Sequence, residues 1–144
     1  MSAVDVLDFV EAFRAGGPQH EERRYYDFTI NGRSLRTMLA PGDKIGLFGW
    51  LPNQVEAAFA RWLLLRERSA LPSGRVPLYI CPECGDLGCQ SLSARVIEEP
   101  DRFVWTELAY EANYDAGPAT SFVEVGPFSF EKAAYEAILH RFTR

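Results

Sequence analysis

The segment VPLYICPECGDLGCQSLSARVIEEPDRFVWTELAY, residues 76–110, decides the fold. It contains three runs rich in apolar residues, at 76–81, 89–98 and 102–110, and short stretches with glycine or proline separate them. Apolar and polar residues alternate in the middle run, a pattern typical of a half-buried strand. Because strands joined by short connections pair antiparallel, the segment predicts a three-stranded antiparallel meander that turns at Pro100 and Asp101.

The rest of the chain adds helices and further strands around this meander. Apolar residues recur at intervals of three and four in several segments, which predicts helices near 3–15, 54–67 and 130–142. Short apolar runs predict strands near 25–30 and 121–125. We therefore expect an α+β fold in which helices cover an antiparallel sheet.

Polar residues next to the helical segments predict where the helices begin. Ser34 is expected to cap a short helix that Pro41 soon ends. Asn53 and Glu56 have the spacing of a capping box, and Ser129 precedes the last helix. Residues 41–52 are rich in glycine and proline and are expected to form a loop.

The length of the chain fits a single domain over residues 1–144. Gly16 and Gly17 end the first helical pattern, and a polar stretch follows. Residues 1–24 are therefore expected to form a helical N-terminal appendage. The core is expected to include apolar residues on the buried faces of their elements, namely Phe59, Trp62, Leu92, Val96, Ile138 and Leu139.

Composition and charge narrow the classes of function. The formal net charge is −5, which disfavours a nucleic-acid partner because such proteins usually carry a basic patch. No apolar run approaches the roughly 20 residues that span a bilayer, so no membrane segment is expected. The first residues lack the basic and apolar regions of a secretory signal, and we expect a cytoplasmic protein.

All three cysteines of the chain lie in the first connection of the meander. Cys81, Cys84 and Cys89 have the spacing C-x2-C-x4-C. The piece CPECG resembles the knuckle of rubredoxin and zinc-ribbon proteins, in which a sharp turn brings two thiolates to one metal ion. A zinc ribbon has two such knuckles, and the second is missing. His20 and His140 have no ligand-like neighbours in the sequence, so a fourth ligand would come from Asp86 or a second subunit.

A wider resemblance is carried by three stretches of the chain. They are NGRSL at 31–35, VPLYICPECGDLGC at 76–89, and VW with YEANY at 104–114. These stretches are similar to a group of small uncharacterised bacterial proteins. The resemblance implies a shared fold, and it brings no activity or catalytic residue with it.

Three interpretations of the cysteines stay open. The spacing is compatible with a zinc-type metal site or with a redox dithiol. Gly85, Gly88 and the following strand leave no room for the helix N-terminus on which redox dithiols usually sit. The third interpretation places Cys81 and Cys89 opposite each other across a hairpin, with Cys84 at its tip, as a disulfide or as packed thiols. We favour this third interpretation and expect no bound cofactor.

No catalytic motif is present, and this absence directs the functional hypothesis. We expect a non-catalytic protein-interaction or regulatory domain with an unidentified protein partner. Aromatic residues often anchor interfaces, and the candidates here are Trp50, Trp105, Tyr110 and Tyr114. The alternative is a metal-binding or thiol-redox protein built on Cys81, Cys84 and Cys89.

Overall fold

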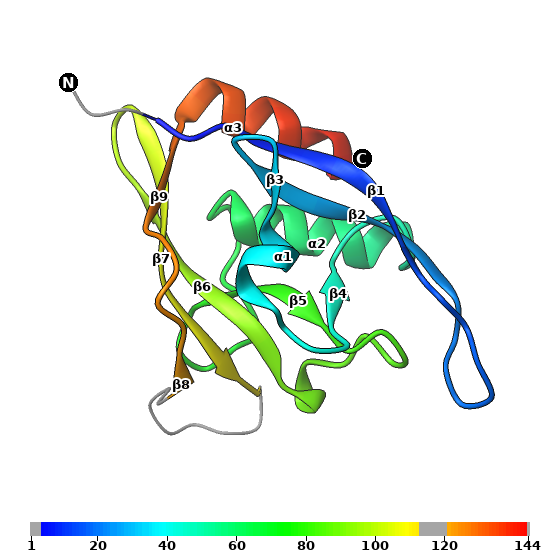
Figure 1. Cartoon of the computed structure of the whole chain (residues 1–144). Helices are drawn as coiled ribbons and strands as arrows, with labels where there is room; N and C mark the ends of the chain where they lie inside the picture. Colours follow the sequence, from blue (N-terminus) through cyan, green and yellow to red (C-terminus); the bar gives the residue numbers. More distant parts are fainter. Residues whose placement is uncertain (1–3, 113–120, 144) are drawn as a thin grey trace.

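A computed structural model describes residues 4–112 and 121–143 of the chain. Antiparallel strands and helices combine in it, which confirms the expected α+β fold (Figure 1). In chain order the elements are β1 (Leu7–Arg14), β2 (Arg23–Ile30), β3 (Arg33–Ser34), α1 (Leu35–Leu39), β4 (Ile45–Gly46), α2 (Asn53–Leu63), β5 (Val76–Ile80), the 3-10 helix η1 (Leu87–Cys89), β6 (Ser91–Glu98), β7 (Arg102–Glu111), β8 (Ser121–Phe122), β9 (Phe128–Glu131), α3 (Lys132–Leu139) and the 3-10 helix η2 (His140–Phe142).

The meander forms as the sequence predicts. Strands β5, β6 and β7 pair antiparallel in the centre of a sheet with the order β4-β5-β6-β7-β8, and β9 also pairs with β7. The tight turn between β6 and β7 is closed by the Glu99 N–H, which donates to the Arg102 carbonyl at 2.8 Å. The first connection, which carries the cysteines, therefore has one fixed strand on each side.

The N-terminal helix expected at 3–15 is wrong, because the chain forms strand β1 there. β1 pairs antiparallel with β2 along its whole length, from Leu7 opposite Ile30 to Arg14 opposite Arg23. Together with β3 the two strands make a second, three-stranded sheet. The helical appendage expected at 1–24 is therefore not found among residues 4–24, since β1 is an edge strand of this sheet.

The helix starts are partly as expected. Ser34 caps α1, and its Oγ accepts a hydrogen bond from the Thr37 N–H at 3.1 Å. α2 is shorter than the predicted 54–67, and Pro52 rather than Asn53 is its N-cap. Glu56 makes no capping box with Asn53. Its buried carboxylate turns back and accepts the backbone N–H groups of the three residues 49–51 at 2.8–3.0 Å.

Two other boundaries differ from the prediction. The strand expected at 121–125 is limited to Ser121 and Phe122, and the loop expected at 41–52 contains the short strand β4. Ser129 caps no helix, because residues 128–131 form β9 and pair with residues 102–105 of β7. The last helix begins only at Lys132. Pairing with an existing strand edge has thus extended the sheet at the expense of the helix.

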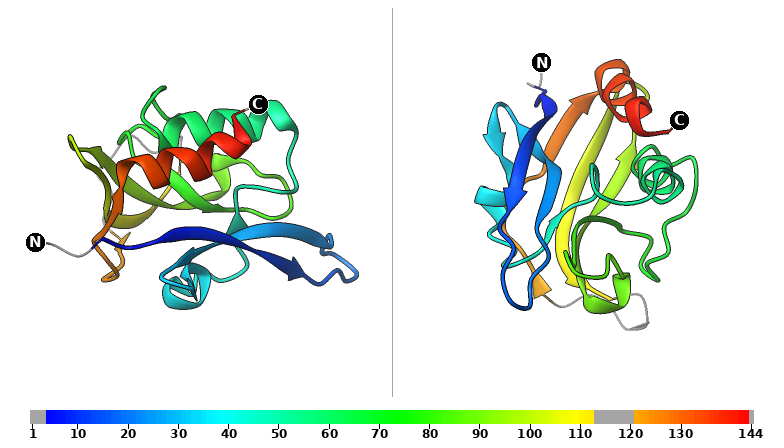
Figure 2. Two further views of the ribbon diagram at one scale, coloured as in Figure 1. Left: turned by 90° about the horizontal axis from the view of Figure 1, so that it is seen from above. Right: turned by 90° about the vertical axis from the view of Figure 1, so that its right-hand side faces the viewer.

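Aromatic side chains join the two sheets and the helices. The ring of Phe28 on β2 contacts Tyr79 of β5 and Trp105 of β7 at centroid distances of 5.9 and 5.5 Å. α2 and α3 lie side by side along the molecule (Figure 2), and the Tyr135 hydroxyl of α3 donates to the Leu63 carbonyl of α2 at 2.6 Å. Four of the expected core residues are buried, Phe59, Leu92, Val96 and Leu139, whereas Trp62 and Ile138 are only partly buried.

Within the described ranges, no helix has the length and apolar character that crossing a membrane requires.

Candidate metal centre

The connection between β5 and β6 is a compact, internally hydrogen-bonded loop. The chain reverses where the Gly85 N–H donates to the Cys81 carbonyl at 3.0 Å, and Gly85 has a φ of +67° that favours glycine. η1 follows, and the Asp86 carboxylate caps it by accepting the Gly88 N–H at 2.9 Å. Leu87 is buried and ties η1 to the core. The backbone around the cysteines is therefore held on both sides of the reversal.

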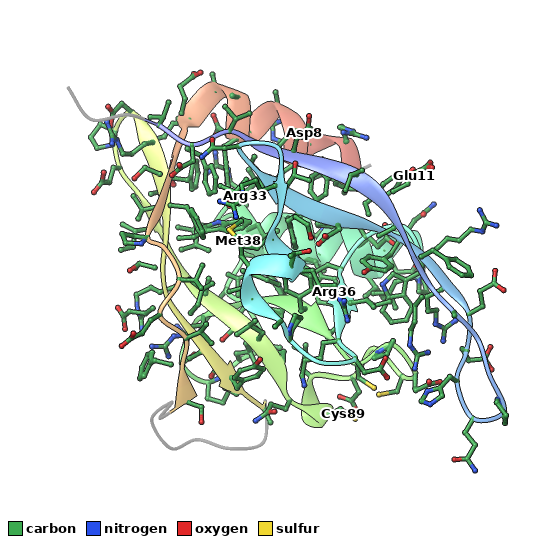
Figure 3. All side chains as sticks on the ribbon, in the orientation of Figure 1. Asp8, Glu11, Arg33, Arg36, Met38 and Cys89 are labelled. Carbon is green, nitrogen blue, oxygen red and sulfur yellow. The ribbon has the colours of Figure 1, made fainter. Side chains whose placement is uncertain are left out.

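This loop brings all three cysteine sulfurs together. The Sγ atoms of Cys81, Cys84 and Cys89 lie within 4.8 Å of one another, and those of Cys84 and Cys89 are 3.3 Å apart. Cys84 and Cys89 are exposed, whereas Cys81 is partly buried. Figure 3 shows Cys89 in this loop, on the side of the molecule where the β1–β2 hairpin projects. A metal ion can reach the three sulfurs from solvent.

Backbone N–H groups point at the sulfurs, as the knuckle resemblance implies. The Asp86 N–H donates to Cys84 Sγ at 3.3 Å. Burial raises the pKa of the Cys81 thiol, but hydrogen bonds from the N–H groups of Cys84 and Glu83 outweigh it, so the pKa lies below its ordinary value. These donors stabilise a thiolate, which is the form that binds metals.

The three sulfurs do not favour three thiolates at once. The hydrogen bond with Cys84 and the negative charge of that thiolate raise the pKa of Cys89 to about 11. A cation between the sulfurs removes this repulsion, because each thiolate then faces a positive charge. The electrostatics of the loop therefore disfavour three unbound thiolates, and a bound cation would relieve their repulsion.

Two expectations about the cysteines need correction. Cys81 and Cys89 do not face each other across paired strands, because β5 ends at Ile80, β6 begins at Ser91, and Tyr79 pairs with Leu92. A short helix does start in the loop, namely η1, against the expectation that the glycines leave no room for one. It has only three residues, so its dipole has little effect on the thiols.

The β1–β2 hairpin holds the cysteine loop from outside. The Arg23 guanidinium donates to the carbonyls of Pro82 and Glu83 at 2.7 and 3.2 Å. Arg14 donates to the Glu83 carboxylate at 2.8 Å. Both arginines lie far from the cysteines in the sequence, and nothing local in the sequence indicates this contact.

A second group of polar side chains lies beside the loop. His20, Asp43 and Glu83 place one ligand atom each within 4.8 Å of one another. Arg14 lies among them and donates to the Asp43 carboxylate at 2.8 Å and to the His20 Nδ1 at 2.8 Å. Its guanidinium already supplies the positive charge there, and it holds the pKa of Asp43 below its ordinary value. This group therefore supports the hairpin rather than a metal ion.

The aromatic residues expected at an interface have different surroundings. Trp105 is fully buried and donates its indole N–H to Tyr135 at 3.0 Å, which removes it from the contact surface. Trp50 is partly buried, donates to the Gly46 carbonyl and stacks under Arg23. Tyr110 is partly buried beside Lys44, and Tyr114 lies outside the described residues.

No known family matches the chain, and neither the curated proteins nor the solved structures gave a match. The resemblances of the sequence therefore identify no family. The structure supports one part of these resemblances, namely that Cys81, Cys84 and Cys89 cluster as a candidate metal site.

Proposed function

We propose that the chain binds a zinc ion through the thiolates of Cys81, Cys84 and Cys89. The observation that carries the proposal is the convergence of three sulfurs within 4.8 Å. Thiolates are soft ligands that favour Zn²⁺ among the common divalent ions, and Zn–S bonds of about 2.3 Å need sulfurs this close together. The N–H groups directed at the Cys81 sulfur support its thiolate form.

The number of protein ligands distinguishes a structural from a catalytic zinc ion. Structural zinc sites usually have four protein ligands, whereas catalytic sites keep one position for water or substrate. Among the described residues, the group of sulfurs includes no fourth His, Asp or Glu side chain. The proposed ion would thus keep an exchangeable fourth position on the surface, or it would take its fourth ligand from a second copy of the chain.

Metal analysis of protein purified without chelators tests the proposal. We expect one zinc ion per chain in the wild type and a stoichiometry near zero in Cys84→Ser. Asp43→Asn is the matched control, since it removes a ligand-type side chain of the neighbouring group and should leave the zinc content unchanged. Titration of metal-free protein with Co²⁺ should give the intense visible bands of a tetrahedral thiolate site.

Two results would contradict the proposal. One is a zinc content that is equal in the wild type and in Cys84→Ser. The other is a wild type that takes up neither zinc nor Co²⁺. Light scattering with and without zinc separates the two sources of the fourth ligand, because a ligand from a second copy makes the dimer depend on zinc.

A protein-interaction role is the second candidate, and one observation favours it. The edge strand β1 and the residues just before it expose four apolar side chains, namely Val4, Val6, Val10 and Phe13. An exposed edge strand with apolar side chains is a surface on which a second copy can add its own β1. Sedimentation of wild type and Val10→Lys tests this: a dimer that the substitution dissociates supports the candidate, and a monomeric wild type contradicts it.

A further inference from the structure

Two of the three thiols are arranged as a pair that differs from the third. The sulfurs of Cys84 and Cys89 are 3.3 Å apart, and both residues are exposed. A disulfide needs sulfurs about 2.05 Å apart, so the two atoms have to approach by only roughly 1 Å. Cys81 is partly buried at the end of β5, where small oxidants have less access.

Contacts within the loop hold this pair of cysteines together. Asp86 caps η1 and donates its N–H to Cys84 Sγ, while the buried Leu87 anchors η1 to the core. These contacts place Cys89, the last residue of η1, next to Cys84. The short distance between the two sulfurs therefore follows from contacts within the folded loop.

We propose that Cys84 and Cys89 are a site of reversible oxidation, at which hydrogen peroxide converts the two thiols into a disulfide. One thiolate attacks an oxygen atom of the peroxide, the O–O bond breaks, and the leaving hydroxide takes up a proton to form water. The second thiol then attacks the sulfur of the resulting sulfenic acid, and the S–O bond breaks with the loss of a second water. Two thiols are oxidised and one peroxide is reduced.

This reaction also regulates the proposed zinc site, a consequence that rests on the proposed function. A disulfide between Cys84 and Cys89 removes two of the three thiolate ligands and leaves Cys81 alone. Oxidation therefore releases the zinc ion, and a thiol reductant restores both the ligands and the capacity to bind it. Zinc protects the pair in turn, because the bound thiolates are less available to the oxidant.

The test begins with metal-free, reduced protein and hydrogen peroxide. We expect a monomer that has lost the mass of two hydrogen atoms, keeps one thiol that an alkylating reagent labels, and regains the other two after reduction. Peptide mapping should place the disulfide between Cys84 and Cys89 and the alkyl group on Cys81. These measurements need no zinc, so they stand even if the proposed function fails.

Single substitutions are the controls. Cys81→Ser retains the pair and should still form the disulfide, whereas Cys84→Ser and Cys89→Ser should lose the Cys84–Cys89 bond. A disulfide that joins Cys81 to either partner in the wild type, or oxidation to sulfinic acids with no disulfide, overturns the proposal. In zinc-loaded protein, a chromogenic chelator should detect one zinc ion released per disulfide; retained zinc after the disulfide has formed overturns the regulatory part alone.

Discussion

At the scale of single residues, Gly85 connects the backbone of the cysteine loop to the core. Its φ of +67° is unfavourable for other residues, and a Cβ atom there would lie 3.0 Å from Leu51 Cδ2. We therefore expect Gly85→Ala to destabilise the protein by about 1–3 kcal/mol and to weaken zinc binding, because the reversal that joins Cys81 to Cys84 has to shift. Chemical denaturation and zinc competition measure the two effects.

Gly42 provides the matched control for this substitution. It has nearly the same φ, +69°, and open space where a Cβ atom would lie. Gly42→Ala should therefore carry a similar backbone cost and leave the zinc affinity unchanged. Equal zinc affinities in Gly85→Ala and the wild type would show that the reversal at Gly85 does not position the sulfurs.

The cysteine site shows what residue patterns predict and what they miss. The spacing of Cys81 and Cys84, with Gly85 after them, was enough to predict a sharp turn, because the pattern acts within five residues of the chain. The closeness of Cys89 to Cys84 depends on η1, a short helix that the glycines conceal. The contacts of Arg14 and Arg23 with the loop have no local pattern, since they join segments about 60 residues apart or more.

At the scale of elements, β1 shows how an apolar pattern fits two structures. Phe9 and Phe13 recur at a helical interval with Val6 and Val10, yet the same residues alternate between the faces of a strand. Residues 7–14 form a strand because β2, a strand of equal length, pairs with their backbone over all eight residues. The middle run of the meander had no such ambiguity, because polar and apolar residues alternate over residues 91–96.

The hairpin of β1 and β2 should depend on Arg14 for its attachment to the cysteine loop. The Arg14 side chain is only 9% exposed and donates to Asp43, Glu83 and the Glu21 carbonyl. We expect Arg14→Ala to destabilise the protein by about 1–3 kcal/mol, because charge-assisted hydrogen bonds are lost. Hydrogen exchange of residues 15–22 should become faster. Arg24→Ala is the control, since that side chain is 85% exposed and should have little effect.

The ion pair of Arg14 with Asp43 also makes the stability of the protein depend on pH. Arg14 holds the pKa of Asp43 below its ordinary value of about 3.9, so the stabilisation is present at neutral pH and is lost as the pH falls through the lowered pKa. The free energy of unfolding should fall by about 0.2–1 kcal/mol when Asp43 is protonated, because its carboxylate is well exposed. Asp43→Asn should lose less stability than the wild type between pH 6 and 3. Parallel curves for the two proteins would contradict the assignment.

At the scale of the whole molecule, the C-terminal segment connects the two sheets. Tyr135 of α3 receives a hydrogen bond from Trp105 of the larger sheet, while the ring of Phe142 in η2 stacks on Phe48 at 4.1 Å and meets Phe9 of β1 edge-on at 5.2 Å. The amphipathic pattern of the last helix was enough to predict that Leu139 is buried, whereas Ile138 is only partly buried. The packing of the C-terminal segment on the smaller sheet could not be predicted, because that sheet exists only if residues 7–14 form the strand β1.

Leu139 tests whether this connection makes the molecule one cooperative unit. Its side chain is fully buried in the core, so Leu139→Ala should lower the free energy of unfolding by about 2–5 kcal/mol. Tryptophan fluorescence reports on the molecule as a whole, because Trp50, Trp62 and Trp105 lie in a loop, in α2 and in β7. The reactivity of the three thiols reports on the cysteine loop. If the core around α3 and the cysteine loop unfold together, both signals should shift to lower denaturant by the same amount. Two separated transitions would mean that the cysteine loop keeps its structure after α3 has left the core, and that the Arg14 and Arg23 contacts hold it independently.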